Sequence, residues 1–146
     1  FMPEIVKYKK KLLAIIYDEK NYNKKKGVIF PSPGFLSLQI GFMTHMKNHL
    51  IKPHTHINHL RKISKTAEVL FVRDGILRVD FYSRGKKYLF SKILKKNNII
   101  ILLEDSHGFK VIKKCFIIEM KQGPYNSKLD KIRFKNIDEN KIKIKK

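Results

Sequence analysis

The chain has little of several features that would assign it to a class at once. Cys115 is its single cysteine, so an intrachain disulfide is excluded and a reducing compartment is expected. No apolar stretch approaches the roughly 20 residues that a helix needs to span a bilayer, and no signal-peptide pattern is present. These absences predict a cytoplasmic protein with no membrane partner.

Acidic residues are also scarce. The chain has 12 Asp and Glu against 33 Lys and Arg, which gives a formal net charge of +21. Such a balance is typical of proteins that neutralise phosphates. Here, however, lysine is spread from Lys7 to Lys146, arginine is scarce, and no RNP-like aromatic pair is present. A solvated basic surface is therefore the favoured interpretation, a nucleic-acid-binding barrel is the less favoured one, and the charge can steer an anionic substrate.

Short apolar segments separated by turn residues make up most of the sequence. At 146 residues the chain is long enough for one domain with one core. Many short strands at close spacing are typical of an all-β sandwich or barrel. The segment 11–17 fits either a strand or a helical turn. The segments expected to be strands are 35–43, 67–73, 76–82, 88–94, 99–103, 109–112 and 115–121.

Three of these segments carry more specific predictions. Asp74-Gly75 separates the segments 67–73 and 76–82, and this dipeptide is a strong signal for a two-residue hairpin turn. We therefore expect the two segments to pair with each other. Alternation along 35–43 places four apolar residues on one face: Leu36, Leu38, Ile40 and Phe42.

Three histidines and one glutamate are the most informative polar residues. In an extended segment His54 and His56 point to the same side, while Glu68 and His107 each begin a later apolar segment. Imidazole and carboxylate groups that converge inside a small β fold are the ligands of a divalent first-row metal ion. We therefore predict one mononuclear site for Fe, Zn, Mn or Ni, with two coordination positions left for a substrate. His59 is the substitute ligand if His56 is not one.

The same residues resemble the motifs of the cupin superfamily. His54-Thr-His56, Glu68 and the following gap to Gly75 resemble the first cupin motif, and His107 takes the place of the histidine in the second. The segments 53–56, 66–70 and 119–125, together with Asp130-Lys131, are similar to the WbuC-type cupin-fold metalloproteins. These are small bacterial cupins often associated with polysaccharide or O-antigen sugar pathways.

This resemblance implies an architecture and a set of partners. It implies a single-domain, cupin-like β-barrel (jelly roll) over residues 35–125. An N-terminal extension, 1–34, packs on the barrel, and a charged C-terminal tail, 126–146, follows it. It also implies a role in carbohydrate biosynthesis, a small-molecule ligand such as an anionic sugar or nucleotide sugar, and a homodimer that pairs through an edge strand.

Three polar residues at the end of the last expected strand are the catalytic candidates. Alternation places Glu119 and Lys121 on one face, and Tyr125 follows in a turn; near a metal ion such groups can transfer protons. The structural alternative is that 122–125 is only a rigid turn. Isomerase, epimerase and iron-dependent oxygenase chemistry all fit this set, and a non-catalytic metal-bound sensor is the alternative function. A further group lines the cavity or faces solvent: Arg78, Asp80 and Tyr82.

Overall fold

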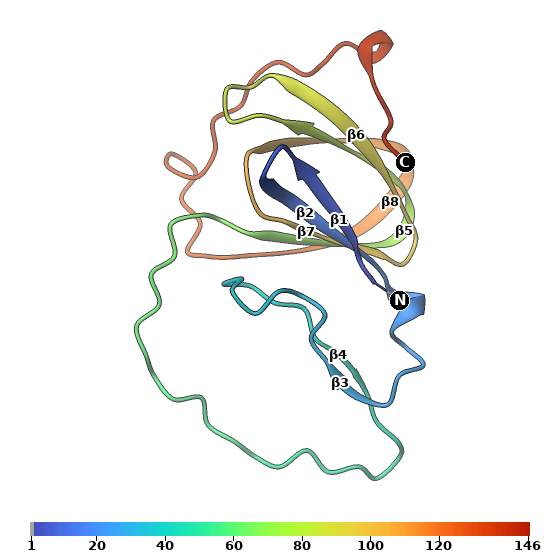
Figure 1. Ribbon diagram of the computed structural model, residues 1–146, viewed down its shortest axis with the longest axis vertical. Coiled ribbons are helices and arrows are strands. Elements are labelled where there is room, and N and C mark those ends of the chain that lie inside the picture. The colour runs from blue at the N-terminus through green and yellow to red at the C-terminus, as the bar shows by residue number, and fades with distance from the viewer. Residues whose placement is uncertain (1) are drawn as a thin grey trace.

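The computed structural model describes residues 2–146 and is built of antiparallel β-strands with two short 3-10 helices (Figure 1). The all-β class expected from the sequence is confirmed. No helix among residues 2–146 is long and apolar enough to cross a membrane. The elements are β1 (Glu4–Tyr8), β2 (Lys11–Asp18), η1 (Glu19–Asn21), β3 (Gly27–Ile29), β4 (Phe42–Thr44), β5 (Glu68–Tyr82), β6 (Tyr88–Lys95), β7 (Asn98–Leu102), β8 (Ser106–Lys121) and η2 (Glu139–Lys141).

Six strands form the main sheet. Its order is β1-β2-β7-β5-β6, and β8 pairs with β5; β3 and β4 form a separate two-stranded sheet. β1 and β2 lie in the stretch 1–34 that was expected to be an extension, yet they are integral strands of the main sheet. Within the described residues no strand pairing closes this sheet into a barrel. The all-β architecture is therefore as expected, and a closed jelly roll is not found in the described residues.

Two apolar cores lie on opposite faces of the main sheet, because side chains alternate along each strand. In β7, Ile100 and Leu102 belong to the first core, whereas Ile99 and Ile101 belong to the second. Burial on both faces explains why β7 is a continuous apolar run in the sequence.

The long strands β5 and β8 pair with each other and bend back together at one side of the molecule (Figure 1). Register shifts between Val72 and Leu77 mark bulges at this bend, and bulges bend the strand that contains them. Gly75 lies in the bend with φ of +91°, and a Cβ there would lie 2.1 Å from the carbonyl oxygen of Lys114. Only glycine fits this position.

The predicted hairpin at Asp74-Gly75 is wrong. In the described chain the two halves of β5 do not pair with each other: the first half pairs with β7 and β8, and the second with β6 and β8. The chain bends at this dipeptide, but the bend belongs to one strand that stays paired to β8. Likewise, the segments expected at 109–112 and 115–121 are parts of the single strand β8.

The segment between the N-terminal strands and β5 is mostly irregular. The expected strand 35–43 forms only at its end, in β4. Its expected apolar face is nevertheless confirmed, since Leu36, Leu38, Ile40 and Phe42 all pack against the second core. The following segment, 45–66, swings away from the main sheet as an extended loop (Figure 1).

Candidate functional site

A pocket of about 470 Å³ lies where the bent β5–β8 pair meets the chain that follows β8. Its walls come from both ends of β8, from the ends of β5, and from residues 130–136. The volume is within the range of small-molecule sites. Glu68 and His107 both line it, so the pocket contains two of the residues that the sequence singled out.

Glu68 and His107 are hydrogen-bonded inside this pocket. His107 Nε2 donates to Glu68 Oε2 over 2.9 Å, and the side chains of His107 and Glu68 are 25% and 7% exposed, respectively. This hydrogen bond lowers the pKa of Glu68 below its ordinary value; burial opposes the effect, while the positive charges of His107, Lys131 and Lys121 add to it. Glu68 is therefore an ionised, largely buried carboxylate that orients the imidazole.

The bend in β5 and β8 brings this pair together. Glu68 is paired with Lys121 at one end of the two strands, and His107 is paired with Phe81 at the other. The thirteen positions from Glu68 to Phe81 would span roughly 40 Å in a straight strand. Because the bulges around Gly75 fold the strand pair back, two side chains at its opposite ends reach hydrogen-bonding distance.

Basic and acidic side chains share the rest of the lining. Lys131 Nζ lies 3.7 Å from Glu68 Oε1, and Lys121 Nζ lies 4.3 Å from the centre of the Tyr125 ring. Arg133 and Asp130 also line the pocket. Such a lining offers cations to an acidic group, and acceptors and an aromatic face to a hydroxylated ring.

The structure separates the three catalytic candidates. Lys121 and Tyr125 line the pocket, whereas Glu119 is not part of its lining. Glu119 is half-exposed, and its Oε1 lies 3.6 Å from Lys121 Nζ. Glu119 thus contacts the pocket only through that lysine.

The structure does not bring His54 and His56 to Glu68 and His107. Both histidines lie exposed in the loop 45–66, with ring centroids 5.2 Å apart, and neither lines the pocket. His54 Nδ1 contacts the backbone oxygen of Lys52 at 3.1 Å. The physical reason is that this loop has no sheet pairing to direct its side chains inward. His59 is exposed in the same loop.

The residues in the pocket, as they lie, do not fit the predicted mononuclear metal centre. Within residues 2–146 no group of three or more His, Cys, Asp and Glu side chains is placed to hold an ion. Glu68 and His107 bond to each other, and the ammonium of Lys131 lies near the other carboxylate oxygen. Two donors that satisfy each other beside a lysine are a poor site for a divalent cation.

Sequence reasoning missed the part of the pocket that comes from the C-terminal segment. Lys131, Arg133 and Phe134 all lie in the stretch expected to be only a charged tail. The resemblance covers Lys131 without giving it a role in the site, and no local pattern distinguishes Lys131 and Arg133 from the many other basic residues of this chain. Searches of the chain against models of protein families, curated proteins and solved structures find no match.

Proposed function

We propose that this chain binds a small anionic, sugar-like molecule in the pocket and that His107, held by Glu68, transfers a proton on it. The observation that carries the proposal is the 2.9 Å contact between His107 Nε2 and Glu68 Oε2 inside the pocket. A carboxylate bonded to one ring nitrogen fixes the tautomer and the orientation of the ring. The other ring nitrogen is then the one that exchanges a proton with a ligand.

The class of ligand follows from the mixed lining. Lys121, Lys131 and Arg133 suit a phosphate or carboxylate group. Asp130 accepts hydrogen bonds from hydroxyl groups, and the ring of Tyr125 offers an apolar face to a sugar. The net charge of +21 attracts such anions over a longer range.

The reaction that needs only these groups is isomerisation or epimerisation. His107 takes a proton from the carbon beside a carbonyl group, while the charge that develops on the oxygen is stabilised by Lys121 or Lys131. For an epimerisation, the imidazolium then returns the proton to the other face of the same carbon. For an isomerisation, it returns the proton to the neighbouring carbon, while Lys121 or Lys131 protonates the former carbonyl oxygen and takes the proton of the neighbouring hydroxyl group. No electron donor or acceptor is consumed.

The alternative is a ligand-binding protein without catalysis that uses the same pocket. His107→Gln separates the two functions, because glutamine keeps hydrogen-bonding capacity but does not titrate. An enzyme with this variant still binds the ligand and loses turnover. A sensor shows no turnover in either form.

A cupin-type metal centre is the second candidate. It requires the loop 45–66 to carry His54 and His56 to the pocket. One observation favours this idea: the loop leads directly into Glu68, and Thr66 already lines the pocket. The test is metal content and zinc titration of the untagged protein beside the double variant His54→Ala, His56→Ala. Stoichiometric metal that the double variant loses supports the centre, and equal metal in both excludes it.

The homodimer expected from the resemblance also stays a proposal. Its support is the outer edge of β8, which pairs only with β5 in the described chain and leaves backbone groups unpaired. Phe116, Ile118 and Met120 are exposed on this strand. Light scattering after size-exclusion chromatography measures the mass, and a monomer at all concentrations contradicts the dimer.

Binding of glucose 1-phosphate, a nucleotide sugar and neutral glucose, measured by calorimetry, tests the proposed function. Lys131→Met removes a cation from the pocket and is expected to weaken the anionic ligands about tenfold. Lys128→Met is the matched control, since it removes the same charge from the same segment outside the pocket lining. Equal effects of the two variants, or no binding by the wild type, contradict the proposal.

A further inference from the structure

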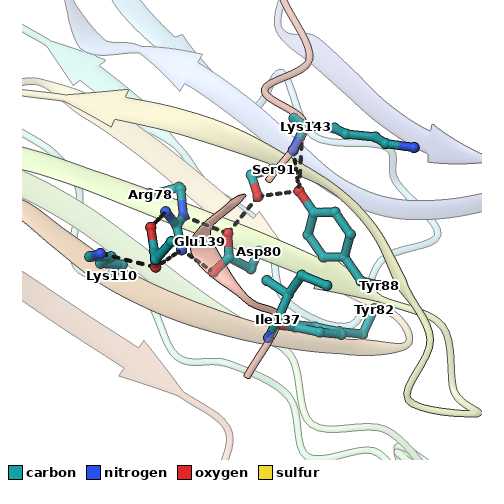
Figure 2. Close-up of polar contacts among 9 residues, drawn as sticks. All are labelled: Arg78, Asp80, Tyr82, Tyr88, Ser91, Lys110, Ile137, Glu139 and Lys143. Atoms are coloured by element: carbon teal, nitrogen blue, oxygen red, sulfur yellow. Dashed lines mark hydrogen bonds and ion pairs between the residues drawn. The ribbon is translucent and has the colours of Figure 1, made fainter. Parts of the chain in front are cut away.

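The C-terminal strap, residues 130–145, is docked on the main sheet by hydrogen bonds from its backbone to side chains and backbone of the sheet. Tyr82 Oη accepts from the backbone N–H of Ile137 over 3.1 Å, and Tyr88 Oη accepts from that of Lys143 over 2.9 Å. The backbone N–H of Ser91 donates to the oxygen of Lys143, and the backbone oxygen of Ser91 accepts from the N–H of Lys145. The end of the strap thus adds to the free edge of β6 (Figure 2).

A buried ion pair on β5 provides the polar anchor beneath the strap. Arg78 and Asp80 are 7% and 6% exposed at their side chains, and Arg78 Nε donates to Asp80 Oδ1 over 2.7 Å. The other side of the guanidinium faces Glu139 of the strap, with bonds of 2.8 and 3.0 Å. Lys110 Nζ lies 2.9 Å from the same carboxylate (Figure 2). A buried guanidinium needs such partners, so Glu139 satisfies donors that β5 cannot satisfy alone.

The anchor and the pocket are parts of one segment. Residues 130–136 form a pocket wall, and Glu139 lies just beyond them in η2. Tyr82 joins the two: it lines the pocket, its ring packs edge-on against Phe134 at 5.1 Å, and its hydroxyl holds Ile137. Movement of the strap at Glu139 therefore moves the pocket wall.

We propose that Glu139 is a positioning residue: its ion pair with Arg78 docks the C-terminal strap and thereby holds Lys131 and Arg133 at the pocket. When this contact is broken, the strap loosens and the pocket loses its basic wall. The effect on ligand affinity rests on the proposed function, whereas the docking of the strap does not.

Glu139→Ala is the test variant, and Asp138→Ala is its matched control. Both remove one negative charge from neighbouring positions, but Asp138 pairs only with Lys141 in the described structure, and neither residue lines the pocket. The three measurements are hydrogen exchange of the strap amides, the NMR signal of the His107 ring at fixed pH, and the affinity for inorganic pyrophosphate.

In Glu139→Ala we expect about fivefold faster exchange at Ile137, Lys143 and Lys145, and a similar loss of pyrophosphate affinity. The His107 ring signal shifts as well, because Lys131 moves away from Glu68. Asp138→Ala leaves all three readings at their wild-type values. Two results overturn the inference: unchanged exchange in Glu139→Ala, or faster exchange with the His107 signal unchanged. If the wild type binds no pyrophosphate, the anionic ligand class fails, and the exchange and ring signals still decide the role of Glu139.

Discussion

Gly75→Ala tests the bend on which the site depends. Gly75 has φ of +91°, and an added Cβ would lie 2.1 Å from the oxygen of Lys114 and 2.7 Å from the Cα of Cys115. Both contacts are with the backbone of β8, so no flexible side chain can give way. The substitution therefore forces the β5–β8 pair apart at its bulge or changes the backbone conformation of residue 75.

The size of the effect has two parts. The left-handed conformation costs an alanine about 1 kcal/mol relative to glycine. Overpacking against β8 adds roughly 2 kcal/mol, in the range measured for added methyl groups in closed interiors. The sum of about 3 kcal/mol lowers the melting temperature of a domain of this size by roughly 10 °C.

Thermal and urea unfolding measure this loss directly. Gly85→Ala is the control, because the nearest atom to its added Cβ is Ser83 Oγ at 3.8 Å and its φ is not positive. We expect the control to unfold within about 0.5 kcal/mol of the wild type. A Gly75→Ala protein as stable as that control would refute the argument that the bend requires glycine.

Three further predictions concern charge and metal. Contact with Arg78 and Lys110 lowers the pKa of Glu139 from 4.5 to about 2. The contribution of Glu139 to stability is therefore present above pH 4.5 and is lost as the pH falls to about 2. The melting temperatures of wild type and Glu139→Ala should differ at pH 6 and converge near pH 2. The pKa of Glu68 is also lowered, so the wild type should be more stable than Glu68→Gln at neutral pH and should lose this difference as the pH falls below about 4.5. If the melting temperatures of the two proteins depend on pH in the same way, the contact with His107 is contradicted. Dialysis against EDTA should leave pyrophosphate affinity unchanged, because the anion is held by lysine and arginine side chains; a loss that zinc restores would favour the metal centre.

The strands were the most predictable part of the fold. The bounds of β6 and β7 lie within one residue of the expected ones. Strands with buried faces are recognisable because their apolar residues form an alternating or a continuous pattern in the sequence. The pairing was less predictable. A glycine with positive φ serves a hairpin turn and a bulge equally well, so Asp74-Gly75 indicated a bend without indicating which strands pair across it.

The site could be predicted only in part, for a similar reason. Glu68, His107, Lys121 and Tyr125 line one pocket, since the first three lie at or next to strand ends and Tyr125 follows β8. The expectation for His54 and His56 depended on a strand that does not form. Contacts such as Arg78 with Glu139, 61 positions apart, join elements that no local pattern relates. The pocket wall that the C-terminal strap provides also depends on contacts between elements far apart in the sequence.

The most direct test of the central claim is the location of a bound ligand. Chemical-shift mapping of the labelled protein during titration with glucose 1-phosphate gives this location residue by residue. The account predicts the largest changes at His107, Lys121 and Lys131, with Glu68→Gln reducing them. Changes confined to the loop 45–66, or no change at the ring of His107, would contradict it.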